Sequence, residues 1–258
     1  MLGASKAGLL GASGSGAAIE PAYAHYARWD AGEAAKISTG SGTWASSDSG
    51  SLPTITLQMI DAGANPSTIG YASTQNGRNV IACPVNRLFR ISSGGDATSR
   101  SNYSIIMVAC GSAGTSARPL RLANVTRGFE LNGVGGTGAD RMDFLGGSGN
   151  DRTMSQTGIG LSNGTRRAWG ISYDGTAGIH SALIASSLPG TLTAGTTGTN
   201  QTGGTAILTG GTAFELGGAI GFIGDEAFDL CETIFYSSSL SQIELDAEIS
   251  RLSSKWGL

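Results

Sequence analysis

Four acidic residues near the C-terminal end of the chain are the first candidates for catalytic chemistry. Asp225, Glu226, Asp229 and Glu232 lie close together in the sequence. Glycoside hydrolysis requires two carboxyl groups that face each other across a sugar. Glu226 and Glu232 share the parity of one strand face, whereas Asp229 between them falls on the opposite face. The spacing argues against a hydrolase, and we predict that Asp229 and Glu232 are turn and strand-edge groups.

Nucleophilic catalysis and phosphate binding have equally little support. His25 and His180 are the only histidines, and neither belongs to a local Ser-His-Asp signature. No G-x-S-x-G elbow is present. Residues 133–138 match G-x-G-x-x-G, but with 42 glycines in 258 residues about one such match is expected by chance. A strand pattern follows this segment, so we predict a loop there and no enzymatic activity.

Calcium is the one cofactor that the sequence leaves open. Asp140, Asp143, Asp151 and Asp174 lie near predicted turns, where carboxylates and carbonyls can bind this ion, but no D-x-D-x-D loop is present. We predict no other metal or cofactor.

A glycan site is the second open ligand class. Trp44, Tyr71 and Trp169 are aromatic residues that could stack on a sugar if they project from loops. Arg166 lies close to Trp169 and could hydrogen-bond the same sugar. These four residues are the predicted glycan-binding set, with solvated loop arginines as the alternative for Arg166.

The elements that must position these residues are predicted to be strands joined by glycine-rich turns. Glycine reaches 42 of 258 residues, proline only 6, charged residues 14% and apolar residues 40%. This composition excludes collagen and argues against a disordered chain. The net charge is −3, whereas a nucleic-acid-binding protein normally presents a basic surface, so nucleic-acid binding is not expected. The length suits one large core, so we predict an all-β protein built as one large sandwich.

The first 22 residues are predicted to form an extended Gly/Ala-rich arm, and residues 23–258 the sandwich domain. The arm has few apolar residues, so we expect a neighbouring chain to hold it. Its apolar run is too short for a secretory signal, and no stretch of the chain is long enough for a membrane helix. The candidate partner-binding residues of the arm are Leu2, Lys6, Leu9 and Leu10.

Three cysteines lie in apolar surroundings. Cys83, Cys110 and Cys231 form no C-x-x-C pair, and two histidines are too few for a zinc site. We predict buried, reduced thiols and folding in a reducing cytoplasm.

Alternating and unbroken apolar patterns locate the strands. Residues 55–59 alternate as in a half-buried strand, and residues 104–110 are apolar enough for a strand covered on both faces. Asn76-Gly77 and Asp174-Gly175 are hairpin signals. The Thr/Gly-rich residues 190–212 are predicted to be a long loop. Further strands are expected around residues 80–83, 88–91, 120–122, 129–131, 142–144, 169–173, 179–185, 214–220 and 228–236.

One helix is predicted, at the C-terminal end. Ser241 and Glu244 form a capping box, and Gly257 stands where a helix commonly stops. The apolar stripe of this helix, which should lie on the sheet, consists of Leu245, Ile249, Leu252 and Trp256.

The C-terminal residues resemble a known family. The segment 228–236 (FDLCETIFY), followed by Leu240-Ser241, Glu244 and the ending 255–258 (KWGL), is similar to the last strand, helix start and K-W-G terminus of laminin-G-like, concanavalin A-like jelly rolls of bacterial and phage proteins. Residues 28–31 (RWDA) resemble the opening W-L-D-A of that family. Residues 76–80 (NGRNV) resemble its N-G-R-P-x-V turn, with Asn79 in place of the proline.

The resemblance implies two antiparallel sheets packed face to face as a jelly roll, but no single function.

Two functions fit the sequence. The first is a non-catalytic bacteriophage virion protein, a capsid decoration or tail surface component, assembled in the host cytoplasm. Its arm would bind other virion proteins, and it would form a homo-oligomer. The alternative is a carbohydrate-binding module or adhesin for cell-surface glycans. Neither involves nucleic acid or membrane insertion.

Overall fold

The protein is described here by a computed structural model. The structure describes residues 21, 23–47, 54–100, 102–111, 117–124, 127–134, 139–146, 152–157, 164–174, 183–186, 195–197, 206–208, 214–217 and 227–258. The predicted arm residues 1–20 and 22, including Leu2, Lys6, Leu9 and Leu10, lie outside these ranges, as do His180, Asp225 and Glu226. The division of the chain at residue 22 stays a prediction.

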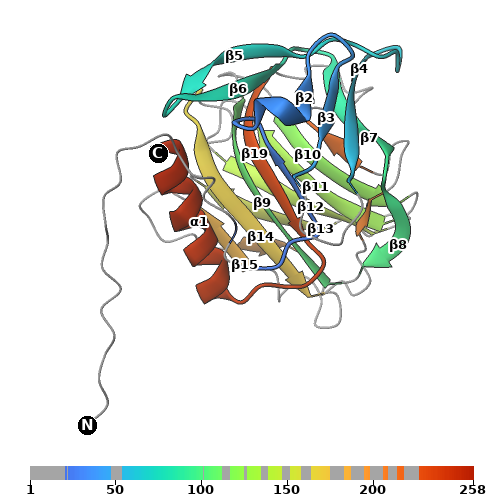
Figure 1. Ribbon diagram of the computed structural model, residues 1–258. Coiled ribbons are helices and arrows are strands. Elements are labelled where there is room, and N and C mark those ends of the chain that lie inside the picture. Colours follow the sequence, from blue (N-terminus) through green and yellow to red (C-terminus); the bar gives the residue numbers. More distant parts are fainter. Residues whose placement is uncertain are drawn as a thin grey trace.

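Seven of the described strands form the first sheet, which carries the helix on its outer side (Figure 1). Its spatial order is β15-β14-β9-β19-β6-β5, and β1 also pairs with β19. The bounds are β1 Ala27–Asp30, β5 Gly70–Gln75, β6 Arg78–Cys83, β9 Asn102–Gly111, β14 Arg167–Asp174, β15 Leu183–Ser186 and β19 Phe228–Tyr236.

Ten of the described strands form the second sheet, in the order β16-β13-β12-β11-β10-β18-β7-β4-β3-β2. Their bounds are β2 Ile37–Ser38, β3 Thr43–Ala45, β4 Thr56–Asp61, β7 Arg87–Ser93, β10 Ala117–Asn124, β11 Arg127–Val134, β12 Ala139–Gly146, β13 Arg152–Thr157, β16 Gly195–Thr197 and β18 Phe214–Leu216. A separate pair consists of β8 Asp96–Arg100 and β17 Ala206–Leu208, and a short 3-10 helix spans Ala34–Lys36.

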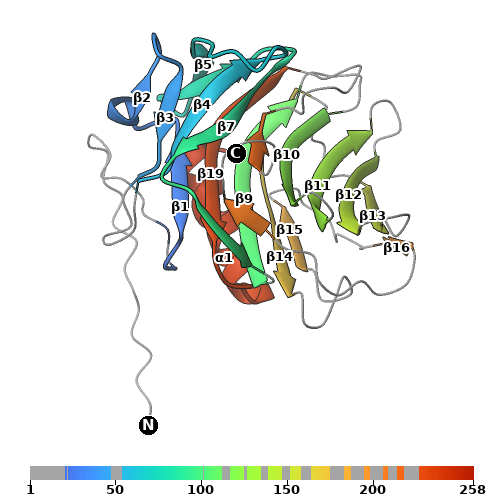
Figure 2. The same ribbon diagram turned by 90° about the vertical axis from the view of Figure 1, so that its right-hand side faces the viewer.

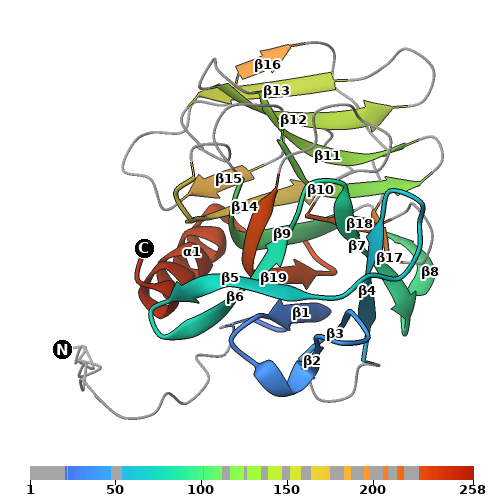
Figure 3. The same ribbon diagram turned by 90° about the horizontal axis from the view of Figure 1, so that it is seen from above.

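The two sheets lie face to face, and Figures 2 and 3 show them from the side and from above. Trp29 of β1 meets Phe214 of β18 across the sandwich, with ring centroids 5.4 Å apart. Trp44 of β3 contacts Phe89 of β7 within the second sheet, at 5.5 Å. All four rings are fully buried, so aromatic packing fills the space between the layers. The predicted antiparallel jelly-roll-like sandwich is confirmed.

Strand β9 is the strand that corresponds to the unbroken apolar run of residues 104–110. It pairs with β14 on one side and β19 on the other, and its residues from Tyr103 to Gly111 are all buried. One face is covered by the opposite sheet and the other by the helix, as expected for a strand without polar alternation. The prediction for residues 104–110 is confirmed.

The Asn76-Gly77 hairpin signal corresponds to a tight turn in the structure. Asn76 and Gly77 have φ values of 48° and 73° between Gln75 and Arg78, which are paired across β5 and β6. Two successive positive φ values are what a tight two-residue hairpin turn requires, and they explain the Asn-Gly sequence. Gly175 lies outside the described residues, so the predicted turn at Asp174-Gly175 stays a prediction, but β15 does pair antiparallel with β14, as expected for the returning strand.

Residues 190–212 are not wholly loop, so that prediction is wrong. Gly195–Thr197 pairs with β13, and Ala206–Leu208 pairs with β8. A tract rich in glycine and threonine can still form strands, because the backbone itself supplies the hydrogen bonds that pair them.

The C-terminal helix α1 (Gln242–Trp256) has the predicted ends and the predicted buried face. Ser241 is the N-cap of a reciprocal capping box with Glu244, and Gly257 closes the helix in the left-handed conformation, at φ 64°. The helix packs against β14, β15 and β9 through the buried stripe Leu245, Ile249, Leu252 and Trp256. In the described part of the chain, no helix combines the length and apolarity needed to cross a lipid bilayer.

The capping box should make helix stability depend on pH. Hydrogen bonds from the Ser241 backbone and hydroxyl hold the pKa of Glu244 below its ordinary value of 4.5. A carboxylate with a lowered pKa stabilises the fold above its unfolded-state pKa and loses this contribution as pH falls through the folded pKa. We therefore expect Glu244→Gln to flatten the loss of stability below about pH 4.5, and Ser241→Ala to cost about 1 kcal/mol at neutral pH. Urea unfolding at stepped pH measures both, and Gln242→Ala at the exposed neighbouring position is the control.

Candidate functional site

An open hollow lies where the β5–β6 hairpin, the beginning of β14 and the end of α1 meet. Its volume is about 490 Å³. A smaller hollow of about 160 Å³ adjoins it at Gly164 and reaches the ends of β9 and β19. The two are lined by Gln75, Cys110, Gly111, Gly164, Thr165, Arg166, Arg167, Ala227, Asp229, Gly257 and Leu258.

Arg166 is the side chain that joins the two hollows. Its Nη2 donates to Asp229 Oδ2 at 2.5 Å and to Ser73 Oγ at 2.5 Å, and its Nη1 donates to Gln75 Oε1 at 3.0 Å. The side chain of Arg166 is 15% exposed and that of Asp229 29%. A guanidinium held by three partners on two strands has a fixed orientation at the surface of the hollow.

The protonation state of Arg166 follows from these contacts. Burial works to lower its pKa, but the hydrogen bond and charge of Asp229, with smaller contributions from Cys231 and Cys110, raise the pKa above its ordinary value. The arginine is therefore permanently charged, and its charge is matched by the carboxylate beside it.

The thiols are buried and unpaired, as predicted. Cys83, Cys110 and Cys231 form no disulfide among themselves. Burial raises the pKa of Cys110, which borders the smaller hollow, to about 11. Burial likewise raises the pKa values of Cys83 and Cys231. Thiols with raised pKa values are poor nucleophiles at neutral pH. Cys110 therefore lines the smaller hollow as an unreactive side chain.

The predicted glycan-binding residues are not brought together. Trp44 lies in β3 and Trp169 in β14, and both indoles are buried in the core, at 0% and 1% exposure. The prediction that they project from loops is wrong, because strands with inward-facing positions bury large rings between the sheets. A sugar cannot stack on either ring.

Tyr71 is 41% exposed on β5, but it does not belong to the hollow. A register shift pairs Tyr71 with Ile81 and Ser73 with Val80. Ile81 and Val80 are consecutive and point to opposite faces, so Tyr71 lies on the other face from Ser73 and its partner Arg166. Of the four predicted residues, Arg166 alone lines the hollow.

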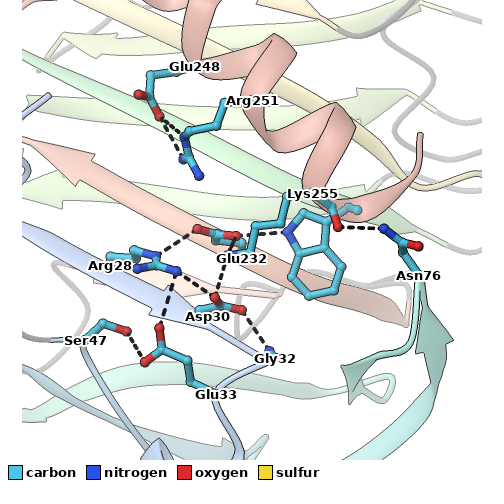
Figure 4. Close-up of polar contacts among 11 residues, drawn as sticks. Arg28, Asp30, Gly32, Glu33, Ser47, Asn76, Glu232, Glu248, Arg251 and Lys255 are labelled. Carbon is cyan, nitrogen blue, oxygen red and sulfur yellow. Dashed lines mark hydrogen bonds and ion pairs between the residues drawn. The ribbon is translucent and has the colours of Figure 1, made fainter. Parts of the chain in front are cut away.

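A second concentration of charge lies beneath the end of α1, and it is buried (Figure 4). Arg28 donates to Glu232 Oε1 at 2.9 Å and to Asp30 Oδ2 at 2.7 Å. Lys255 Nζ donates to the same two carboxylates, at 2.5 Å to Asp30 and 2.6 Å to Glu232. Trp256 Nε1 adds a hydrogen bond of 2.9 Å to Glu232. We call Arg28, Asp30, Glu232 and Lys255 the buried ionic cluster.

This cluster is a structural clamp. Its four side chains are at most 2% exposed, so no substrate can reach them. Each of the two cations contacts both buried anions, and Arg28 also lies 3.3 Å from the partly exposed Glu33, so every buried charge faces opposite charges that offset the cost of desolvation. The contacts join β1 to β19 and α1, two consecutive elements that lie about 200 positions further along the chain.

The cluster corrects the prediction for the acidic residues. Glu232 and Asp229 are not at a strand edge, because β19 has β9 on one side and β1 and β6 on the other. Glu232 lies at the centre of the clamp, and Asp229 forms the surface ion pair with Arg166. The sequence placed Arg28, Asp30 and Lys255 in two motifs that resemble the family, residues 28–31 and 255–258. It did not indicate that these two motifs contact each other in the folded chain.

The clamp also reaches the wall of the hollow. Asn76, in the β5–β6 turn, donates to the backbone carbonyl of Lys255 at 3.0 Å, and Gln75 Nε2 lies 3.4 Å from the carbonyl oxygen of Gly257. The hairpin that carries Ser73 and Gln75 is thus fixed to the helix end that the cluster anchors.

The predicted calcium ligands do not form a described site. Asp140 and Asp143 lie within β12, Asp174 is the last residue of β14, and Asp151 lies outside the described residues. Within the described ranges, no three His, Cys, Asp or Glu side chains lie close enough together to hold a metal ion.

The architecture defines the chain as a jelly-roll-like β-sandwich domain. No protein-family model matches the sequence, and no curated protein sequence matches it. Solved structures with the same fold include domain 4 of AbnA, a GH43 extracellular arabinanase from Geobacillus stearothermophilus, in complex with arabinotriose. This match has a TM-score of 0.58 and 15% identity and covers 87% of this chain and 98% of that one.

The receptor-binding domains of botulinum neurotoxins also share the fold. That of the C/D mosaic serotype matches with a TM-score of 0.57 and 7% identity, over 88% of this chain. That of serotype D, in complex with N-acetylneuraminic acid, matches with a TM-score of 0.57 and 8% identity, also over 88% of this chain. The chain spans about half the length of these toxin domains, 51% and 50%.

Proposed function

We propose that this protein is a non-catalytic carbohydrate-binding domain and that the hollow beside Arg166 holds the sugar. One observation carries the proposal. An arginine oriented by Asp229, Ser73 and Gln75 borders an open hollow of about 490 Å³ on the outer side of the sheet. Sites of this kind bind through a few polar groups whose positions are fixed before the ligand arrives.

The fold supports the same proposal. The arabinanase domain, which this chain matches over 98% of its length, is in complex with arabinotriose, and the serotype D toxin domain, of which this chain spans half, is in complex with N-acetylneuraminic acid. The fold is therefore compatible with saccharide binding, and the site itself is argued from this chain's own residues.

The absence of catalysis is part of the proposal. Of the described residues that line the two hollows, Asp229 is the only one with a carboxylate side chain, and it is paired with Arg166. Glycosidases commonly use two carboxyl groups about 5–9.5 Å apart, one of them free to donate a proton. An ion-paired single carboxylate favours binding over hydrolysis.

The bacteriophage virion function stays a prediction from composition and from the arm. The residues expected to tether it, Leu2, Lys6, Leu9 and Leu10, lie outside the described part of the chain. A carbohydrate-binding role is compatible with display on a surface, and it is the function that the geometry supports better.

The proposal predicts that Arg166 is required for glycan binding. In Arg166→Ala, the donors are lost and Asp229 is left without its partner, so the affinity for glycans bound by the wild type should fall about tenfold to a hundredfold. Arg166→Lys should recover little of this loss, because one ammonium cannot reproduce the fork that reaches three partners. A glycan array followed by calorimetric titration of the hits measures both changes.

Arg87→Ala, which removes an arginine from the second sheet, is the matched control and should bind normally. Thermal unfolding of each variant verifies that the fold is kept. Wild-type protein that binds no glycan at millimolar concentration, or Arg166→Ala protein that binds as well as the wild type, would contradict the proposal.

A further inference from the structure

The polar groups of the hollow indicate the class of sugar. Resting on the proposed function, we infer that the joined hollows take a neutral glycan with adjacent hydroxyl groups in preference to an acidic glycan. Asp229, which lines the smaller hollow, and Ser73, which contacts Arg166 at the rim of the larger one, would recognise these hydroxyls.

The first reason is the local charge. Arg166 would attract an anionic sugar if its charge were free, but Asp229 lies 2.5 Å from its Nη2 and cancels it. The pair is partly buried, so solvent screens the carboxylate less than it would at an open surface. An incoming carboxylate would approach Asp229 as closely as Arg166 and gain little from the site.

Arg167 also lines the larger hollow, but its place in the sheet turns its side chain away from the ion pair of Arg166 and Asp229. It aligns with Ala109 of β9, which in turn aligns with Leu230 of β19, a fully buried core residue. Residues in one register row point to the same face of a sheet, so Arg167 leaves the sheet on the inner face, away from Asp229. Its charge is directed away from the ion pair.

The second reason is the hydrogen-bonding capacity that remains. Asp229 uses Oδ2 for Arg166, and its Oδ1 has no hydrogen-bond partner within the described residues. Ser73 Oγ accepts from Arg166, which leaves its own proton to donate. Gln75 accepts from Arg166 through Oε1, while its Nε2 makes only a long contact of 3.4 Å to Gly257.

The carboxylate of Asp229 is thus a hydrogen-bond acceptor, and the hydroxyl of Ser73 and the amide of Gln75 are donors near it. Asp229 Oδ2 and Ser73 Oγ both contact one nitrogen, Nη2 of Arg166, so the acceptor and the donor are close neighbours. A hydroxyl group both donates and accepts, so two adjacent hydroxyls can satisfy Asp229 and Ser73 together. A carboxylate or sulfate only accepts, and it would leave Asp229 facing a like charge.

Matched pairs of oligosaccharides test the inference. We would titrate the full chain with lactose and 3′-sialyllactose, and with arabinotriose and an oligogalacturonate of the same length, at about 50 mM and about 500 mM NaCl. The neutral member of at least one pair should bind more tightly than its acidic counterpart. Its affinity should change less than about twofold with salt, because no net charge is neutralised on binding.

Asp229→Asn gives the matching variant test. It keeps the size of the side chain but removes the charged acceptor, so affinity for the neutral sugar should fall about tenfold or more. The acidic sugar should bind the variant more tightly than it binds the wild type, since Arg166 is then unneutralised. Asp246→Asn, at an exposed position on α1 with Gln242 as its partner, is the control and should leave both affinities unchanged.

The outcomes separate the two proposals. Salt-sensitive binding that favours the acidic members, with no loss in Asp229→Asn, would overturn the neutral-sugar inference and leave carbohydrate binding intact. Loss of binding in Arg166→Ala but not in Asp229→Asn or in Ser73→Ala would do the same. No binding by any member of the panel at millimolar concentration would remove both.

Discussion

Lys255→Met is expected to lower the free energy of unfolding by about 3–5 kcal/mol. In the native protein, Lys255 Nζ donates to Asp30 and Glu232 inside a cluster that is at most 2% exposed. Methionine fills a similar volume, so the core should not collapse, but two buried carboxylates would then depend on the single charge of Arg28, which also pairs with the partly exposed Glu33. An unbalanced buried charge is far more costly than the loss of a surface ion pair. Urea unfolding followed by tryptophan fluorescence measures the change.

Lys36→Met is the matched control, because Lys36 lies in the partly exposed 3-10 helix Ala34–Lys36 and should cost less than about 1 kcal/mol. If the two lysine variants unfold at the same urea concentration, the cluster does not clamp the helix as described.

Trp256→Ala should destabilise the protein by about 3–5 kcal/mol for a different reason. The indole is fully buried at the end of the apolar stripe of α1, and its removal leaves a cavity between helix and sheet. It also deprives Glu232 of a donor at 2.9 Å. Both effects act at the same end of the helix, where Lys255 belongs to the cluster.

Trp256→Phe separates the two effects. Phenylalanine keeps most of the packing and loses the indole N–H, so its cost should be about 1–3 kcal/mol, the penalty for a buried carboxylate with one donor fewer. Ile243→Ala, at a position that is 81% exposed on the same helix, should change stability by less than about 0.5 kcal/mol. Equal losses in the alanine variants of Trp256 and Ile243 would contradict the assignment of Trp256 to the core.

The consequences of these variants should extend to the hollow. The helix end that the cluster holds also receives the hydrogen bond from Asn76 and the contact from Gln75. A helix end that moves would carry one wall of the hollow with it. The buried cluster is therefore a positioning device for the surface site, although none of its side chains lines that site.

Local patterns in the sequence were enough to predict the elements that depend on nearby residues. The capping box of Ser241 and Glu244, the left-handed end at Gly257 and the tight turn at Asn76-Gly77 were all confirmed, because their geometry is set by residues within a few positions. The fully buried strand β9 was predicted for a related reason, since an unbroken apolar run can be accommodated only where both faces are covered.

Long-range pairing decided the rest. The sequence indicated that Trp44 and Trp169 were available to a sugar, but strand register turned both rings into the core. One signal in the sequence could have indicated the buried ionic cluster, namely charged residues inside otherwise apolar segments. Glu232 lies within a strand of otherwise largely apolar residues, and Lys255 precedes the last residue of the apolar stripe of α1. Such charges are too costly to bury alone, so each one implies a partner that only the fold can supply.

The sequence alone determined an all-β chain with a capped C-terminal helix, because hydrophobic periodicity and turn residues act over short distances. The tertiary structure decided which charges are buried and which reach the surface. Arg28, Asp30, Glu232 and Lys255 come from segments up to 227 positions apart and neutralise one another beneath the helix. Arg166 and Asp229 meet 63 positions apart at the hollow. The distance between charges in space, which sets their energy, cannot be read from their separation along the chain.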